Sequence, residues 1–235
     1  VRRSPKEMGL QPDGAAEPGG AMNSVVPGNP AARTSTAESE VVWSRAEALR
    51  TRAFWLLVVT FGISSMGVTG LNLHVFSYVT DIGHSPVVAA SVMSVIASMQ
   101  LASPLAWGLL AERVDARIAA MLRFVIQAIG LGLAILTGDL FSLYAGFFLY
   151  GIGLGGNMVL PDMLWADYFG RRSLGRIRGM GLLMSQVLAA VGPPFFGFLF
   201  DATGGYGLSF TIFGAALMTS AVLSLMLLPP RARSS

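Results

Sequence analysis

The sequence predicts an all-α membrane protein with six transmembrane helices. Of the 235 residues, 53% are hydrophobic and only 12% are charged, about half the charged share of an ordinary soluble domain. The charges fall almost entirely outside six apolar stretches, each near the ~20 residues that a spanning helix needs. These stretches cover residues 53–80, 85–111, 118–138, 140–161, 179–200 and 208–228.

The segment before the first apolar stretch is predicted to be a linker. Residues 1–43 are rich in Pro, Gly, Ala and Ser and have no apolar period, which is typical of disordered chain. They also lack the short apolar core of a secretory signal. Ser44 and Glu47 have the spacing of a capping box, which predicts the start of a helix that leads into the first span. We therefore expect a disordered cytoplasmic linker over 1–43 and a membrane domain over 44–235 that ends in a short cytoplasmic tail.

The basic residues predict how the spans are oriented. All sixteen Lys and Arg residues lie before the first span, around the loops that follow the second and fourth spans, or in the tail. The three opposite loops contain no Lys or Arg, but each carries one aspartate: Asp81, Asp139 and Asp201. Because cytoplasmic loops carry the excess of Lys and Arg, we expect a multi-pass protein of the cell membrane with both termini in the cytoplasm.

Composition and context exclude several other functions. The chain has no cysteine, so it cannot form disulfides or thiolate metal sites. The net charge of +3 comes from loops between spans, so nucleic acid is not an expected partner. Gly151, Gly153 and Gly156 have the spacing of a dinucleotide-binding loop, but they lie inside an apolar run without the required strand. Gly151 and Gly155 are instead expected to let a neighbouring helix approach closely. We expect neither a cofactor nor a metal.

A repeat with a period of 89 residues relates the second and fifth spans. Proline, glycine and an acid follow one another at four-residue intervals near the end of both spans, at Pro104, Gly108 and Glu112 and again at Pro193, Gly197 and Asp201. Three helices separate the two copies. Because that number is odd, the copies end at opposite membrane faces, and we expect two inverted three-helix repeats, with chance similarity as the alternative.

Several loops resemble a known family. The segment "GLLAERVDAR", Gly108 to Arg117, is similar to the loop motif G-x-x-x-D-R-x-G-x-R of the major facilitator superfamily, with Glu112 for Asp and Asp115 for Gly. "RRSPKEMGLQPDG" and "ADYFGRRSLGRIRG" resemble segments after the sixth and tenth helices of monocarboxylate porters and oxalate/formate antiporters. The resemblance implies that these spans are the seventh to twelfth of a twelve-helix porter whose N-terminal half is missing from this chain.

The resemblance implies secondary active transport of a small organic solute by alternating access, together with a coupling proton or an exchanged anion. A stand-alone six-helix protein that dimerises is an alternative. An intramembrane enzyme is another, since "GISS", Gly62 to Ser65, has the G-x-S-x shape of an intramembrane serine protease. However, His74 lies on the same predicted helix and His84 in the next loop, so no base arrives from a separate helix. We expect no enzyme and no catalytic residues.

Polar residues inside the spans are the candidates for contact with the solute, because such groups tend to face the protein interior or a water-filled path. The resemblance implies that the first, second, fourth and fifth spans line the cavity. The candidates there are Ser65, Thr69, Asn72, Gln100, Ser103, Tyr150, Asn157 and Gln186. Hydrogen bonding between helices is the alternative for each of them. Carboxylate-binding members of the resembled family often have an arginine where this chain has Ser103, so a monocarboxylate substrate does not follow from the resemblance.

Two titratable residues are candidates for proton relay. His74 lies near the outer end of the first span, and histidine is the side chain whose unperturbed charge change falls nearest to neutral pH; a satisfied polar contact is its alternative role. Asp162 is the deepest acid of the fourth span, and its alternative is a salt bridge to Arg123 or to the basic cluster at 171–178. Arg123 itself is expected to snorkel to the lipid headgroups.

The charged cytoplasmic loops are candidates for a gate. Opposite charges in two loops can pair at the inner face and stabilise one transport state, whereas a purely topological role is the alternative. The candidate gate residues are Gly108, Glu112, Arg113, Asp115 and Arg117 in the first loop, and Asp167, Arg171 and Arg172 in the second.

Overall fold

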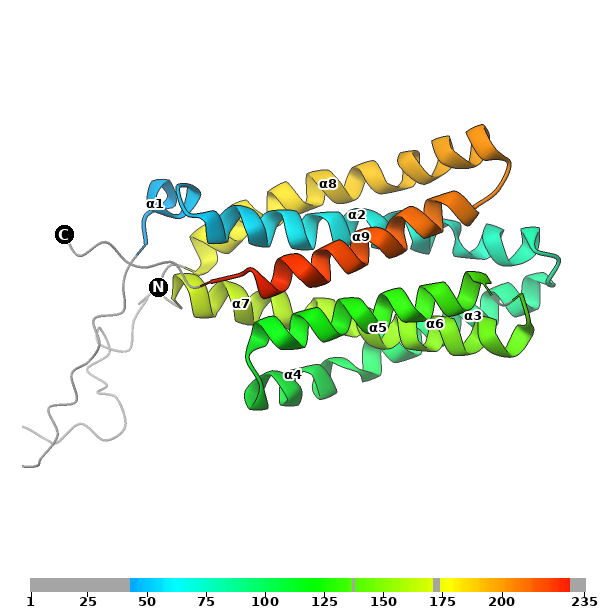
Figure 1. The fold of residues 1–235 in the computed structure, drawn as a ribbon, viewed down its shortest axis with the longest axis horizontal. Coiled ribbons are helices and arrows are strands. Elements are labelled where there is room, and N and C mark those ends of the chain that lie inside the picture. Colours follow the sequence, from blue (N-terminus) through cyan, green and yellow to red (C-terminus); the bar gives the residue numbers. More distant parts are fainter. Residues whose placement is uncertain (1–42, 137, 171–173, 229–235) are drawn as a thin grey trace, which may run out of the picture. The chain divides into compact units, whose positions relative to one another are not determined.

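The computed structural model describes residues 43–136, 138–170 and 174–228. The expected linker over 1–43 thus lies, except for Trp43, outside the described residues, as does the end of the tail. The helices run side by side along one direction (Figure 1). They are α1 (Arg45–Leu49), α2 (Arg52–Asp81), α3 (Pro86–Ala102), α4 (Pro104–Arg113), α5 (Ala116–Leu136), α6 (Leu140–Gly155), the 3-10 helix η2 (Gly156–Met158), α7 (Leu160–Phe169), α8 (Leu174–Thr203) and α9 (Gly207–Leu225).

The six predicted spans correspond to these helices. Five are long and apolar enough to cross a bilayer, namely α2, α5, the stretch from α6 to α7, α8 and α9. The sixth is formed by α3 and α4, which pass the same test together although the pair is bent by 40°. The expectation of an all-α fold with six spans is therefore confirmed, with the second span bent and the fourth interrupted by a short 3-10 turn.

The chain enters the first span through two helices rather than one. The capping box is present, since Ser44 N donates to Glu47 Oε2 at 2.8 Å and Glu47 N donates to Ser44 Oγ at 3.2 Å. However, the helix that it starts, α1, ends at Leu49. Thr51 then caps α2 by accepting from Phe54 N at 3.2 Å. A second cap fixes a second helix start, so the prediction that the first helix continues into the span was wrong.

Two of the spans are interrupted within the stretches predicted to be single helices. Pro104 begins α4 directly after Ser103, and a proline cannot donate the backbone hydrogen bond that a continuous helix needs. In the fourth span, η2 separates α6 from α7, and α7 continues to Phe169, beyond the predicted end at residue 161. The prediction stopped at the first charge, Asp162, whereas the helix accommodates that charge by pairing it with another helix.

The contacts between spans support a 3+3 arrangement. The first span packs on the fifth (α2 on α8) and the second on the fourth (α3 on α6), while the third packs on the fourth (α5 on α6) and the first on the sixth (α2 on α9). The third and sixth spans, α5 and α9, pack on each other. If spans one, two and three are exchanged with spans four, five and six, each of these contacts becomes a contact of the same set. Two related three-helix repeats require this pattern.

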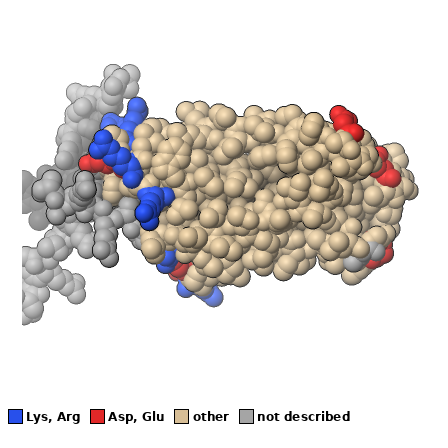
Figure 2. All heavy atoms as spheres, turned by 45° about the horizontal axis from the view of Figure 1, so that its top comes forward, with Lys and Arg blue, Asp and Glu red and all other residues tan. Residues whose placement is uncertain are grey.

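Charges separate between the two ends of the helix bundle. Figure 2 shows Lys and Arg at one end, together with some acids, and only acids at the other end. The acidic end contains the last turns of α2 and α8 and the start of α6, which carry Asp81, Asp201 and the capping residue Asp139. Asp139 caps α6 by accepting from Ser142 N at 2.9 Å. The broad surface between the ends is uncharged in this view, as expected for a surface that faces lipid.

Glycines allow α5 and α6 to pack backbone against backbone. A Cβ atom at Gly130 would lie 2.5 Å from Tyr150 N and 2.6 Å from the Gly146 carbonyl oxygen. A Cβ at Gly146 would lie equally close to Ala134 N and to the Gly130 carbonyl oxygen, at 2.5 and 2.6 Å. Close approach of this kind is typical of small residues at membrane helix interfaces. Because backbone cannot move aside as a side-chain tip can, no larger residue fits at either position.

We predict that Gly130→Ala destabilises the fold by about 1–3 kcal/mol, because the added methyl group forces α5 away from α6. Gly132→Ala on the same helix is the matched control, since a Cβ there has no neighbour within 4 Å. It should be neutral or stabilising by up to about 1 kcal/mol, because alanine favours a helix over glycine. Unfolding in detergent micelles, followed by circular dichroism, measures both changes. Equal stability of the two variants would contradict this account of the interface.

Candidate functional site

A cavity of about 320 Å³ lies between α2, α8 and the interrupted fourth span. It brings together four residues singled out from the sequence: Ser65, Asn157, Asp162 and Gln186. The other lining residues are Phe61, Met158, Pro161, Trp165, Arg178, Leu182 and Ser185. Amides, hydroxyls and one ion pair thus line a pocket whose remaining wall is apolar and aromatic, a composition typical of small-molecule sites.

A second cavity, of about 160 Å³, lies between α2 and α3. Two further candidates, Asn72 and Gln100, line it together with apolar side chains. The Asn72 Oδ1 atom is buried and has no hydrogen-bond partner among the described residues. The candidates on α2 therefore divide between two cavities, with Ser65 in the first and Asn72 in the second.

Three candidates line neither cavity. Thr69 donates to the carbonyl oxygen of Ala189 on α8 at 2.6 Å, and Ser103 donates to that of Ile152 on α6 at 3.0 Å. Tyr150 is fully buried. Helical spacing correctly predicts that Ser65 and Thr69 share a side of α2, but α8 packs closely over part of that side. For Thr69 and Ser103, the structure has the alternative arrangement, a hydrogen bond between helices.

The two helix interruptions lie against each other. The Ile152 carbonyl near the end of α6 accepts from Ser103 Oγ and also from Trp107 Nε1, the latter at 2.7 Å. A Cβ at Gly155 would meet Ser103 Oγ and would lie 3.0 Å from the Gln100 carbonyl oxygen. The contact between the second and fourth spans is thus both tight and polar. It positions η2, whose Asn157 points its side chain to the cavity lining.

The glycine motif of α6 serves helix packing on two sides. A Cβ at Gly151 would lie 2.9 Å from the Ile96 carbonyl oxygen on α3, which confirms that the Gly151 and Gly155 pair lets α3 approach. Gly153 and Gly156 face α5 instead, since a Cβ there would lie 2.8 Å from Gln127 Cβ or 2.7 Å from Arg123 Cδ. Sequence reasoning missed this second pair, although its three-residue spacing also places both glycines near one side of a helix.

An ion pair lies in the cavity lining. Arg178 Nη2 lies 2.6 Å from Asp162 Oδ1 and 2.8 Å from Oδ2. Both side chains are partly exposed, with 41% of Arg178 and 45% of Asp162 accessible. Pairs as open as this one stabilise a fold by about 0–1 kcal/mol. Of the alternatives for Asp162, the structure therefore has the bridge to the basic cluster at 171–178 and not the bridge to Arg123.

Arg123 does not snorkel to the headgroups, so that expectation was wrong. Its side chain is fully buried in the described structure, where Nη2 lies 3.3 Å from Ser64 Oγ. The guanidinium carbon lies 4.0 Å from the centroid of the Phe124 ring and 5.6 Å from that of Phe61. A Cβ at Gly156 would lie 2.7 Å from Arg123 Cδ, so the glycine leaves room for the buried side chain. In the sequence, an arginine two turns into a span looks the same whether its side chain is buried between helices or reaches the membrane interface.

The Arg123 guanidinium is incompletely paired. Its Nε and Nη1 atoms have no hydrogen-bond partner within the described part of the chain. The ion pairs Asp115–Arg117 and Asp162–Arg178 do not include it. Burying one ion costs several kcal/mol even after relaxation, whereas a desolvated cation–π contact contributes about 2 kcal/mol. The aromatic rings and Ser64 therefore offset only part of the cost of this charge.

His74 connects three spans. Its Nδ1 atom lies 3.1 Å from the Tyr206 hydroxyl, and its Nε2 atom lies 3.3 Å from the Pro193 carbonyl oxygen. The ring also stacks on Phe196. A neutral ring that carries its proton on Nε2 satisfies both contacts, because the carbonyl only accepts. His74 therefore has the satisfied polar contacts named as its alternative, and proton relay by this residue is untested.

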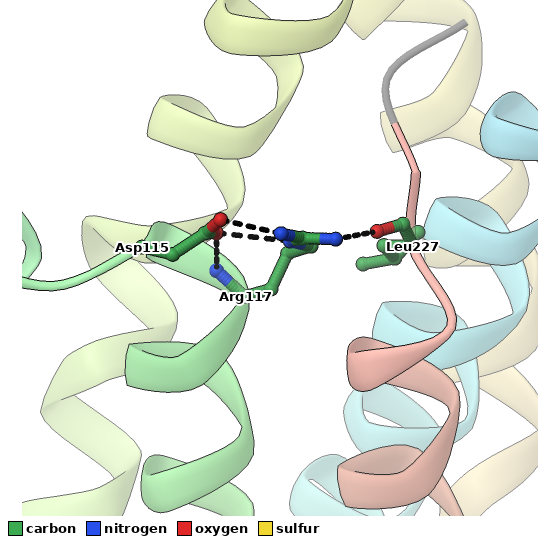
Figure 3. A network of polar contacts seen from close by, with 3 residues as sticks. All are labelled: Asp115, Arg117 and Leu227. Carbon is green, nitrogen blue, oxygen red and sulfur yellow. Dashed lines mark hydrogen bonds and ion pairs between the residues drawn. The ribbon is translucent and has the colours of Figure 1, made fainter.

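The first charged loop is tied to the segment that follows the last helix, α9. Arg117 contacts Asp115 from its backbone N–H, Nε and Nη2, at 2.9, 3.0 and 2.6 Å, and Nη1 donates to the Leu227 carbonyl oxygen at 2.8 Å (Figure 3). The hydrogen bonds from Arg117 hold the pKa of the Asp115 carboxyl below its usual value. Glu112 and Arg113 are exposed, and a Cβ at Gly108 would have Val159 Cγ1 as its neighbour, at 4.0 Å. These contacts stabilise the loop itself.

The contact between the two charged loops remains an expectation. Asp167, at the end of α7, is exposed. Arg171 and Arg172 lie outside the described residues. Within the part of the chain that the structure describes, Asp115 pairs with Arg117, two residues along the chain.

Comparison with known proteins identifies the family. A family model described as Major Facilitator Superfamily matches residues 57–235. Monocarboxylate transporter 4 of Rattus norvegicus is 26% identical over 181 residues, which are 75% of this chain and 38% of that transporter. Monocarboxylate transporter 12-B of Danio rerio is also 26% identical, over 177 residues that are 72% of this chain and 36% of the relative.

A solved structure shows the same fold. The Escherichia coli fucose:proton symporter matches with a TM-score of 0.67 and 13% sequence identity, over 80% of this chain and 46% of the symporter. The chain thus spans less than half the length of the curated relatives and of the symporter. The family match favours a transporter over the intramembrane enzyme. With most of its length matched by the family model, the chain belongs to the major facilitator superfamily.

Proposed function

We propose that this chain is the C-terminal half of a porter that moves a small organic solute across the membrane by alternating access. The observation that carries the proposal is the cavity of about 320 Å³ between α2, α8 and the interrupted fourth span. Substrate sites in transporters of this kind lie where two repeats meet and use discontinuous helices. Both conditions hold here, since α2 and α7 belong to different repeats and η2 interrupts the fourth span.

The lining residues suit a small polar solute. The amides of Asn157 and Gln186 and the hydroxyls of Ser65 and Ser185 offer both donors and acceptors, while Trp165 supplies an apolar wall. The names of the two monocarboxylate transporters favour a small carboxylic acid as the solute.

The ion pair of the cavity suggests how a coupling ion takes part. A proton on Asp162 would break the pair with Arg178 and leave the guanidinium free for an anion. An exchanged anion that binds Arg178 directly is the other route. Both routes use the partial exposure of the pair, and His74 stays a second proposed proton carrier.

The charge distribution supports a cytoplasmic location for the end that carries the Lys and Arg residues in Figure 2. With an even number of spans, the linker and the tail lie on that same side, and the membrane is the cell membrane. We propose that a further six-helix half covers the open side of the cavity. The charged loops, Glu112 to Arg117 and the segment from Asp167 to Arg172, then face that half as a gate.

We predict that Asn157→Ala or Gln186→Ala raises the half-saturation concentration for uptake of radiolabelled L-lactate about fivefold. The loss of one hydrogen bond of about 1 kcal/mol to the bound solute accounts for this size. Thr219→Ala is the control, because Thr219 lies exposed on α9 and bonds only its own helix, at Ala215. Uptake is measured in cells that lack their own lactate transport, with acetate and pyruvate as parallel probes. Equal responses of the three variants at matched membrane levels would exclude the cavity as the solute site.

For orientation, the absence of cysteine provides a clean background. We predict that single cysteines at His84 and Gly204 react with an impermeant maleimide added outside intact cells. A cysteine at Asp115, an exposed residue at the opposite end, should react only after the membrane is permeabilised. The opposite labelling pattern would reverse the proposed orientation.

A further inference from the structure

We infer that Arg123 and Ser64 form an oxyanion-binding subsite that lies behind Phe61 and opens to the main cavity when the Phe61 side chain turns away. The inference rests on the proposed function in one respect, which is that the cavity is the place where solute and co-ion bind. It goes further by naming the buried cation and the class of ligand that meets it.

The first step concerns charge. Arg123 is fully buried, yet its Nε and Nη1 atoms have no partner within the described residues. The cation in the cavity lining, Arg178, is already neutralised by Asp162. The unmatched positive charge around this cavity therefore resides on Arg123. A protein retains such a costly group when a ligand of opposite charge meets it in part of the functional cycle.

The second step concerns position. Phe61 lines the cavity, and its ring centroid lies 5.6 Å from the Arg123 guanidinium carbon. Ser64, the hydroxyl partner of Arg123, is the neighbour in sequence of Ser65, which lines the cavity. Gly156, which contacts the Arg123 stem, likewise precedes the cavity residue Asn157. Phe61 thus lies both against the guanidinium and in the cavity wall.

The third step concerns the ligand. A guanidinium group presents its N–H donors in one plane and matches planar oxyanions such as carboxylate better than it matches a spherical ion. The Ser64 hydroxyl adds a further donor on the same side of the side chain. Two sources share this chemistry, namely the acid group of the transported solute and an inorganic oxyanion that accompanies it. In this structure the rings of Phe124 and Phe61 lie over the cation, with their centroids 4.0 and 5.6 Å from the guanidinium carbon.

The test measures anion binding by purified protein in lipid nanodiscs. Sodium chloride is replaced stepwise by sodium acetate or sodium nitrate at constant ionic strength, and the midpoint of thermal unfolding is recorded. We expect a saturable rise of the midpoint with one or both oxyanions. A response to acetate alone assigns the subsite to the acid group of the solute, whereas equal responses assign it to a planar inorganic co-ion as well. No response in either replacement would overturn the inference.

Variants separate this subsite from the ion pair. Arg123→Gln should abolish the saturable response, and Arg123→Lys should weaken it, because an ammonium lacks the planar fork. Arg176→Gln, at an exposed arginine of α8 that is not among the cavity-lining residues, is the matched control and should keep the response. Phe61→Ala should strengthen apparent acetate affinity about tenfold, since it raises the population of the open subsite. Loss of the response in Arg178→Gln but not in Arg123→Gln would overturn the inference, as would an unchanged affinity in Phe61→Ala.

Stability in chloride gives an independent reading. If Arg123 serves an absent anion, Arg123→Gln unfolds at the same temperature as the parent protein or higher, because an unmatched buried charge has been removed. A marked loss of stability in this variant, combined with unaltered acetate binding by Phe61→Ala, would make Arg123 a structural residue only. Lactate uptake by the same variants is a separate measurement, so binding without uptake would count against the proposed function and leave the subsite standing.

Discussion

The two hydrogen bonds that Ser103 and Trp107 donate to the Ile152 carbonyl are the interaction on which the site depends. Inside a bilayer no water satisfies a backbone group, so a span can be interrupted only where other parts of the protein supply partners. The second span breaks beside Pro104. Two of its side chains then donate hydrogen bonds to the Ile152 carbonyl, which lies near the break in the fourth span. Glycines at the contact allow the necessary approach. Without this pairing, η2 would not hold Asn157 in the lining of the cavity.

The pairing and burial of charged side chains differ between the end of the bundle, the cavity lining and the interior. At the end that carries the basic residues, Arg117 pairs with Asp115 and ties the start of α5 to Leu227. In the cavity lining, Arg178 and Asp162 neutralise each other while both remain accessible. In the interior, Arg123 contacts the rings of Phe61 and Phe124 and the Ser64 hydroxyl among the described residues. The arginine at the end of the bundle is thus paired and partly exposed, whereas Arg123 is buried and incompletely paired. An incompletely paired charge is costly where water is absent, which makes Arg123 the candidate for a functional role beside the cavity.

The fold and the chemistry of the site follow different rules in this family. A structure with 13% identity shares the helix arrangement, because many apolar side chains can replace one another in a span without changing its hydropathy. The site is more individual. Where the resemblance implies an arginine in carboxylate-binding members, this chain has Ser103, and that serine caps a carbonyl instead of facing the cavity. The cations near the cavity come from α8 and α5. Function therefore has to be argued from these side chains rather than from the fold.

The sequence by itself determined the six spans, their order, the capping box at Ser44 and the packing role of Gly151 and Gly155. These features depend on hydropathy, spacing and local hydrogen bonds, all of which act between residues near in the chain. Ser65, Asn157, Asp162 and Gln186 meet in one cavity because α2, η2, α7 and α8 pack together, which spacing within a single helix does not determine. Only the tertiary structure decided that Thr69 and Ser103 bond other helices, that Asp162 pairs with Arg178, and that Arg123 is buried. Those outcomes depend on which helix covers each face of a span. Burial and pairing arise between residues that are distant in the sequence, so local patterns do not determine them.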